Sequence, residues 1–335
     1  MNSGENRSYS ALQITDNGGL FHSQVIEKKI SDLPDHDVLV RVYYSSLNYK
    51  DALSATGNRS VTEIYPHTPG IDAAGVVEES RDSRFKSGDP VIVTSYDLGM
   101  NTPGGFGQYI RVPGNWIVPL PEQLSLKESM IIGTAGFTAS YGILKITEGG
   151  IHPDDGPVVV TGATGGVGCF AVALLSQLGY EVIAITGKLE QHDFLKSLGA
   201  AGIEDRDAVT DLSQKMLLKG TWAAAVDTVG AEILDTLIRQ TRHNGIVTCC
   251  GNILGHKLHT NIYPFILRGV SLMGIDSGNC LMQTRIRLWE KLAGKWKPEK
   301  LQQLFREVPL KRLPDEIDSI LKGNQIGRVL VNLTD

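Results

Sequence analysis

A glycine-dense turn after an apolar run is the stretch of this sequence with the clearest chemical meaning. Residues 158–160 are three valines, and glycine then stands at positions 162, 165, 166 and 168. A strand that leads through such a turn into a helix builds a cradle for a diphosphate, because glycine lets the backbone approach the ligand and the helix N-terminus offers free N–H groups. The glycine spacing departs from the usual G-x-G-x-x-G, and an ordinary strand–helix turn without a ligand is the alternative.

The strand expected at 181–186 indicates which dinucleotide would bind. An NAD site usually places Asp or Glu at the end of this second strand, where it holds the ribose 2′-hydroxyl. Here Thr186, Gly187 and Lys188 stand at that point, and Arg206 follows the expected third strand. A 2′-phosphate would meet a hydroxyl, a flexible backbone and positive charge, so the sequence predicts NADPH over NADH. The alternative is that Lys188 only starts a solvated helix.

Composition bounds the class of protein. A chain of 335 residues suits two domains, and 41% apolar with 21% charged residues is ordinary for a globular protein. A net charge of −5 gives no reason to expect nucleic acid or an anionic membrane as a partner. No apolar run approaches the ~20 residues of a membrane span, and the polar N-terminus lacks a secretory h-region, so we expect a cytoplasmic protein. The four cysteines and eight histidines show no zinc-ligand spacing, and no metal site is predicted.

The first third of the chain is predicted to be β-rich. Short strands separated by Gly and Pro are typical of a small antiparallel barrel. We expect these strands at 38–44, 75–78, 89–93, 104–112 and 116–121.

The pattern changes near Lys127, where Ser125 and Glu128 form a capping box for a helix. Strands and helices then alternate, which predicts a doubly wound parallel sheet of six strands. These strands are expected at 158–161, 181–186, around 203, 222–227, 245–249 and 271–275. The tail adds a strand, a helix begun by Pro314 and a last strand. We therefore expect a discontinuous first domain, 1–127 with 300–335, and a nucleotide domain, 128–299.

Polar residues gather just past the strongest strand of the first domain. Asn48, Tyr49 and Asp51 follow it, and Asp72 lies in a second cluster after Pro69 and Gly70. We expect Asn48 and Tyr49 to belong to a site, while Asp51 could instead cap a helix that starts at Ala52. Asp72 is expected to satisfy backbone donors in a glycine turn.

Along its whole length the chain resembles the medium-chain dehydrogenases/reductases. Within that superfamily it is similar to the YhdH/YhfP group of NADPH-dependent quinone oxidoreductases and acrylyl-CoA reductases. The segments that carry this resemblance are 47–53 (LNYKDAL), 69–75 (PGIDAAG), 133–139 (GTAGFTA), 226–230 (VDTVG), 264–268 (PFILR) and 324–326 (NQI).

The resemblance implies a GroES-like catalytic domain joined to a Rossmann domain of α/β class, with the substrate between them. Zinc-dependent members carry a Cys near position 48 and Gly-His-Glu near positions 70–72. This chain has neither, which disfavours a zinc-dependent alcohol dehydrogenase. The nucleotide contacts of the group, carried over by motif, fall on Tyr49, Thr164, Gly165, Gly166, Val167, Thr186, Gly187, Lys188, Arg206, Asn252, Ile266, Ser277 and Asn324.

A hydride acceptor with an activated C=C bond would develop negative charge on its carbonyl oxygen. Without a metal, hydrogen-bond donors must stabilise that charge, and the Asn48 amide and the Tyr49 hydroxyl are the candidates. Tyr49, Asp51 through a water, or solvent would then protonate the α-carbon.

Three functions remain open at this point: reduction of acrylyl-CoA or a related enoyl thioester, reduction of a quinone, and NADPH binding without catalysis. A coenzyme A substrate would need cations for its phosphates, and Arg59, Lys295 and Lys297 are candidates. The apolar strand at 271–275 is expected at the edge of the sheet, where it would pair with a second copy in a homodimer.

Overall fold

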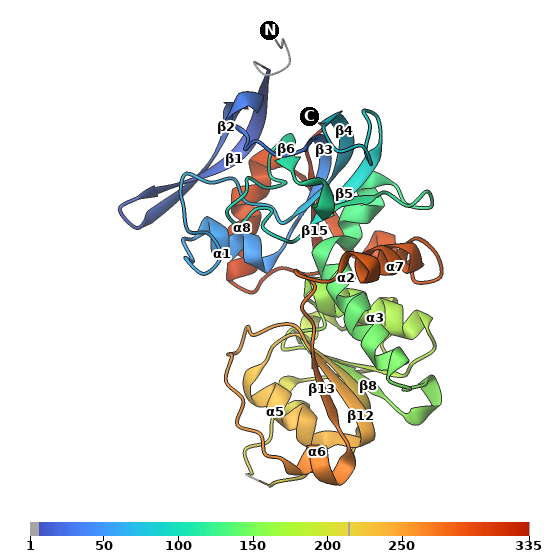
Figure 1. Cartoon of the computed structure of the whole chain (residues 1–335). Helices are drawn as coiled ribbons and strands as arrows, with labels where there is room; N and C mark the ends of the chain where they lie inside the picture. Colours follow the sequence, from blue (N-terminus) through green and yellow to red (C-terminus); the bar gives the residue numbers. More distant parts are fainter. Residues whose placement is uncertain (1–6, 214, 335) are drawn as a thin grey trace. The chain divides into compact units, whose positions relative to one another are not determined.

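The structure is a computed structural model that describes residues 7–213 and 215–334. The chain divides into two compact units (Figure 1). The first comprises residues 1–134, 278–294 and 305–335, and the second comprises 135–277 and 295–304. No helix in the described ranges is both long and apolar enough to cross a bilayer.

The first unit is built on a mainly antiparallel seven-stranded sheet. Its path is β14 (Phe305–Pro309), β15 (Arg328–Asn332), β3 (Val38–Leu47), β4 (Asp72–Ser80), β5 (Pro90–Thr94) and β7 (Ile117–Pro119), with β6 (Tyr109–Val112) paired to β3. The tail strand β15 pairs antiparallel with β3, so that Val329 lies opposite Leu47. The C-terminal segment therefore lies directly beside the strand that leads into the polar cluster.

A hairpin of β1 (Ser8–Asn17) and β2 (Leu20–Lys29) extends from this unit (Figure 1). The helices of the unit are α1 (Tyr49–Ala55), α7 (Met282–Ala293) and α8 (Leu313–Leu321). Helix α1 starts at Tyr49 with Asn48 as its N-cap residue, so the predicted start at Ala52 is wrong. Asp51 instead occupies the third helical position.

The second unit holds the predicted six-stranded parallel sheet, which confirms the fold class. Its order is β10 (Gly202–Glu204), β9 (Val182–Ile185), β8 (Val158–Val160), β11 (Trp222–Asp227), β12 (Thr241–Cys249) and β13 (Ser271–Gly274). The helices are α3 (Gly166–Gln177), α4 (His192–Leu198), α5 (Ala231–Gln240) and α6 (Tyr263–Arg268). Strands β8 and β11 are buried throughout, as expected for a sheet covered on both faces.

The unit boundaries differ from the expected ones in three places. The first unit runs on to Thr134 rather than ending at 127, it also contains residues 278–294, and its last segment starts at 305 rather than at 300. The second difference has a physical cause in α7, where the buried Arg285 donates to the hydroxyl of Thr94 at 2.9 Å and lies 4.6 Å from the ring centre of Tyr96. These contacts hold α7 to the first unit.

Helix α2 (Leu126–Glu148) begins with the predicted capping box and breaks at Gly133. Gly133 has φ +50° and ψ −162°, far from helical values. A Cβ atom there would lie 2.5 Å from a guanidinium nitrogen of Arg328 and from the hydroxyl of Ser46, and 2.7 Å from a carboxylate oxygen of Asp72. Both the backbone conformation and the available space therefore require glycine.

We expect Gly133→Ala to lower the free energy of unfolding by about 3 kcal/mol or more, because strain and a steric clash act together. Gly88→Ala is the matched control: Gly88 also has a positive φ (+95°), but nothing lies within 4 Å of the added Cβ. Its cost should be about 1–2 kcal/mol. Urea unfolding of both variants measures the difference, and equal losses would show that the polar neighbours of Gly133 do not matter.

Candidate functional site

The glycine turn of the second unit lies at the carboxyl edge of its parallel sheet. Strand β8 ends at Val160, Gly162 takes φ +58°, and α3 starts at Gly166. A Cβ at Gly168 would lie 2.3 Å from the carbonyl oxygen of Gly162, so the turn and the helix approach each other too closely for any other residue. The N-cap residue Gly165 has no side chain to cap α3, which leaves the first helical N–H groups available to an anion.

A buried polar cluster fixes this turn to the neighbouring strand. The hydroxyl of Thr161 donates to Asp227 at 2.7 Å and accepts from the backbone N–H of Thr228, whose own hydroxyl donates to the carbonyl of Thr161. Asp227 also accepts from the N–H of Gly230 at 2.9 Å. These bonds tie the ends of β8 and β11 together, so the glycine turn is held rigidly.

Thr186, Gly187, Lys188 and Arg206 come together at the ends of β9 and β10. The N–H of Lys188 donates to the Thr186 hydroxyl at 3.0 Å, and a Cβ at Gly187 would lie 2.9–3.1 Å from the guanidinium group of Arg206. Burial lowers the pKa of Lys188; Glu190 opposes this shift, and the positive charge of Arg206 adds to it. Lys188 and Arg206 therefore bring two positively charged side chains to this edge of the sheet.

Two further predicted nucleotide residues lie at the same edge of the sheet. Asn252 follows β12 and lines a pocket of about 390 Å³ together with Cys250 and Gly230. Ser277 follows β13, and its hydroxyl accepts from Thr138 at 2.7 Å.

Ile266 is not positioned for the same ligand. It belongs to α6, which precedes β13 and therefore lies at the amino edge of the parallel sheet, opposite the glycine turn (Figure 1). Arg268 of α6 donates to the carbonyl of Thr241 at the start of β12, which fixes the helix there. The side chain of Ile266 is 63% exposed. The expected contact between Ile266 and the nucleotide therefore gains no support from its position in the sheet.

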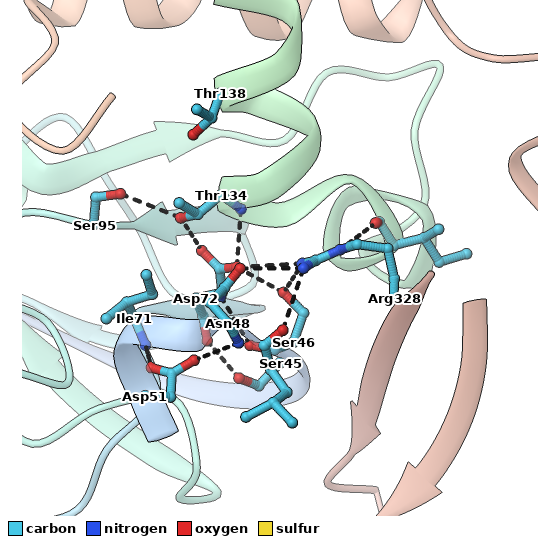
Figure 2. A network of polar contacts seen from close by, with 12 residues as sticks. Ser45, Ser46, Asn48, Asp51, Ile71, Asp72, Ser95, Thr134, Thr138 and Arg328 are labelled. Carbon is cyan, nitrogen blue, oxygen red and sulfur yellow. Dashed lines mark hydrogen bonds and ion pairs between the residues drawn. The ribbon is translucent and has the colours of Figure 1, made fainter. Parts of the chain in front are cut away.

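In the first unit, the polar cluster converges on the carboxylate of Asp72 (Figure 2). Oδ2 accepts from the Ser46 hydroxyl at 2.6 Å, from the Asn48 amide at 2.8 Å and from the N–H of Thr134 at 2.9 Å. Oδ1 accepts from the Thr134 hydroxyl at 2.5 Å, and a guanidinium nitrogen of Arg328 lies 3.7 Å from Oδ2. Asp72 is fully buried, so these donors replace the water it has lost.

The Asn48 amide is already fully engaged. Its Nδ2 donates to the carbonyl of Ser46 at 3.2 Å and to Asp72, and its Oδ1 accepts from Arg328 at 3.1 Å. The side chain is 8% exposed. Both amide hydrogens of Asn48, the expected donor to a substrate oxygen, are therefore bonded within the protein.

Asp51 is fully buried and accepts from the backbone N–H groups of Asn48 and Ile71, each at 2.8 Å. Burial first, and the charge of Asp72 second, raise the pKa of Asp51 to about 7, although the two backbone donors oppose the shift. Its contacts make Asp51 part of the first turn of α1.

Tyr49 and Asn324 are the exposed members of the predicted set in the first unit. The Tyr49 side chain is 36% exposed and makes no hydrogen bond to a residue that the structure describes. Asn324 is exposed after α8, and its backbone N–H donates to Ser319 at 3.0 Å. Three residues of the cluster, Ser46, Thr134 and Arg328, were given no role from sequence, although Thr134 lies in a segment that carries the family resemblance.

The three cations considered for coenzyme A are divided between the units: Arg59 belongs to the first, and Lys295 and Lys297 belong to the second. Arg59 pairs with Asp16 at 2.6 Å and packs over the rings of Phe21 and Tyr65. The carbonyls of Lys295 and Lys297 accept from Gln177, the last residue of α3, at the end of that helix away from the glycine turn.

Comparison with known proteins gives two family-model matches and full-length relatives. Residues 34–122 match the alcohol dehydrogenase GroES-like domain, and residues 166–293 match the zinc-binding dehydrogenase model. The chain is 44% identical to YhfP of Bacillus subtilis, named as a quinone oxidoreductase, over 97% of this chain and 99% of the relative. It is 42% identical to the acrylyl-CoA reductase AcuI of Ruegeria pomeroyi, over 94% and 96%.

The chain belongs to the medium-chain dehydrogenase/reductase superfamily. Solved structures agree: YhdH of Salmonella enterica in complex with NADP superposes with a TM-score of 0.94 at 43% identity, covering 97% of this chain and all of the other. YhfP with NAD bound gives 0.95 at 44% identity, covering 98% of this chain and all of the other. The predicted YhdH/YhfP resemblance is confirmed.

One of the two matching family models is named for zinc binding. The side chains around Asn48 do not suit a zinc ion. The described residues include no group of three or more His, Cys, Asp or Glu side chains able to hold a metal. Where zinc-dependent members carry ligands, this superfamily member has the guanidinium of Arg328 bonded to Asn48 and paired with Asp72. A second cation there would be repelled by the first.

The raised pKa of Asp51 predicts a pH dependence of stability. Folded Asp51 keeps its proton up to a pKa of about 7, whereas unfolded Asp releases it near 3.8. Its contribution to stability is therefore complete below the unfolded value and is lost as the pH rises through the folded value. Between roughly pH 5 and pH 8 the free energy of unfolding should fall by about 2 kcal/mol from this group.

Asp51→Asn should flatten that fall, as measured by urea unfolding at both pH values. Asp35→Asn, which changes a carboxylate that is 85% exposed, should leave the pH dependence as in the native protein. The same fall in Asp51→Asn as in the native protein would contradict a protonated Asp51.

Proposed function

We propose that this protein is an NADPH-dependent reductase that transfers hydride to an activated C=C bond, with an α,β-unsaturated acyl-CoA such as acrylyl-CoA as substrate. The observation that carries the proposal is 42% identity to an acrylyl-CoA reductase over nearly the whole of both chains. Reduction of a quinone is the alternative, favoured by the 44% identity to YhfP. Binding of NADPH without turnover is the non-catalytic alternative.

The residues at the carboxyl edge of the Rossmann sheet fit NADPH. The turn of Thr164, Gly165, Gly166 and Val167 would hold the diphosphate at the N-terminus of α3. Gly187, Lys188 and Arg206 would hold the 2′-phosphate, since two adjacent cations are stabilised by that dianion. Asn252 and Ser277, in the same unit, would lie along the nicotinamide half of the cofactor. When bound, NADPH supplies the hydride.

Tyr49 is the group we assign to the reacting substrate. Its ring is exposed and its hydroxyl has no partner among the described residues, so it can donate to a carbonyl oxygen on which negative charge develops. The same O–H group can deliver a proton to the α-carbon. Asn48 and Asp51 act indirectly, because their hydrogen bonds fix the first turn of α1, to which Tyr49 belongs.

We also propose that the enzyme is a cytoplasmic homodimer. All four cysteines are free thiols, in keeping with a reducing compartment. Strand β13 is the last strand of the sheet and leaves an open edge. Exposed apolar side chains gather in the segment before it: Ile253, Leu254, Leu258, Ile262, Tyr263, Ile266 and Leu267. A second copy related by a two-fold axis would cover this surface and join the two sheets.

Consumption of NADPH with acrylyl-CoA and with benzoquinone tests the activity. We expect turnover of acrylyl-CoA, with hydride at the β-carbon and a solvent proton at the α-carbon of the product. Tyr49→Phe should lower kcat for acrylyl-CoA on the order of 100-fold and affect a quinone less, because no carbon is protonated there. Tyr263→Phe, equally exposed at 37%, is the control and should keep native kcat. Tight NADPH binding with neither substrate turned over would leave the non-catalytic alternative.

Cofactor preference tests the anion site separately. Native enzyme should have the higher kcat/KM with NADPH, and Lys188→Glu should reduce the ratio of NADPH to NADH on the order of 10-fold to 100-fold. Gly187→Ala should reduce it less, because the new Cβ displaces the Arg206 guanidinium without removing its charge. Lys196→Glu, on α4, is the control for a change of net charge. Equal use of both cofactors by the native enzyme would argue against the site.

A further inference from the structure

Arg328 connects several segments of the first unit through its buried guanidinium group. It is the first residue of β15, and its side chain is 1% exposed. Its guanidinium donates to three acceptors in two segments: to the carbonyl of Ile131 at 3.2 Å in α2, and to the carbonyl of Leu47 at 3.2 Å and the hydroxyl of Ser46 at 2.8 Å at the end of β3. Figure 2 shows these bonds beside the ion pair with Asp72.

The same guanidinium also orients Asn48. It donates to Asn48 Oδ1 at 3.1 Å, while Nδ2 of that amide donates to Ser46 and Asp72. Three bonds on a planar amide fix both its position and its rotation. Because Asn48 is the N-cap of α1, these bonds also fix the point at which the helix starts.

Tyr49 is the next residue in the chain. The first turn of α1 is held on one side by the Asn48 amide and on the other by Asp51, which accepts from the N–H groups of Asn48 and Ile71. The direction in which the Tyr49 ring projects from α1 therefore depends on the Arg328 guanidinium, which is bonded to Asn48.

We propose that Arg328 is a positioning residue for Tyr49, acting through Asn48 and Asp72. The inference rests on the proposed role of Tyr49 in the reduction and assigns to it a residue that lies 280 positions from Asn48 along the chain. Lysine cannot replace this arginine, because a single ammonium group cannot serve Ile131, Leu47, Ser46 and Asn48 in their fixed directions.

Arg239 in the second unit provides a matched comparison. It is also buried, pairs with Asp211 and Asp235 at 3.3 Å each and donates to the carbonyls of Asp211 and Lys215. None of these partners belongs to a candidate catalytic group. Arg239→Lys should therefore affect stability without any specific effect on Tyr49.

A double-mutant cycle on kcat with NADPH and acrylyl-CoA separates the two roles. Arg328→Lys should lower kcat about 10-fold or more in the native background, since a small misplacement of a reacting group has effects of this size. In the Tyr49→Phe background the same change should lower kcat less than about 2-fold. Arg239→Lys should have the same effect in both backgrounds. An equal loss from Arg328→Lys in both backgrounds overturns the proposal.

Amide hydrogen exchange gives a readout that needs no activity. In Arg328→Lys the peptide covering Tyr49–Ala55 should exchange faster than in the native protein, and in Arg239→Lys it should not. Unchanged exchange in Arg328→Lys overturns the proposal even if kcat falls. If Arg328→Lys does not fold, Ser46→Ala replaces it, because it removes one donor to Asp72 and one acceptor of Arg328.

Failure of the proposed function is distinguishable from failure of this inference. Native kcat in Tyr49→Phe would reject Tyr49 as the reacting group, and the exchange measurement would still decide whether Arg328 holds its helical turn.

Discussion

The carboxylate of Asp72 is the constraint around which the first unit is arranged. A fully buried charge is tolerated only when donors and a countercharge replace its water. Here the donors come from the end of β3, the N-cap of α1, the break in α2 and the start of β15. These segments are far apart in sequence, so satisfying one carboxylate requires the tail to return to the first unit. It also requires glycine at position 133, because any Cβ there would occupy the space of the donors.

The same network determines which side chains remain available for chemistry. Ser46, Asn48 and Thr134 all direct their hydrogens at Asp72 or at backbone carbonyls, so none is left to donate to a substrate. Tyr49 follows Asn48 directly in sequence. Its ring is exposed, and its hydroxyl forms no hydrogen bond with a residue that the structure describes. Because Ser46, Asn48 and Thr134 are held by hydrogen bonds, the first turn of α1 is fixed, while the Tyr49 hydroxyl stays available as a donor. This separation is the usual condition for electrostatic stabilisation of a developing charge.

Sequence reasoning succeeded where periodicity decides structure and failed where long-range contacts do. The apolar runs at 158–160 and 222–227 have the composition of strands buried on both faces, and both are strands of the parallel sheet. The start of α1 was placed too late because Asn48 and Asp51 are both good capping residues, and only the three-dimensional partners of Asn48 show which one is the cap. A motif likewise gives the position of Ile266 along the chain but not the edge of the sheet at which it lies. Arg328 carries no local signal at all.

The two candidate sites differ in how their buried charges are balanced. Around Asp72, the negative charge is balanced within the protein, and the result is a rigid structure with nothing left over. At the edge of the parallel sheet, burial and the positive charge of Arg206 disfavour the charge of Lys188, while Glu190 favours it, and no carboxylate in the described residues forms an ion pair with Arg206. The cost that burial and Arg206 impose on the charged Lys188 would be relieved by a bound anion. The protein thus bears an electrostatic cost at the place where a dianionic phosphate would bind, and Gly187 keeps that place open by leaving room for the guanidinium.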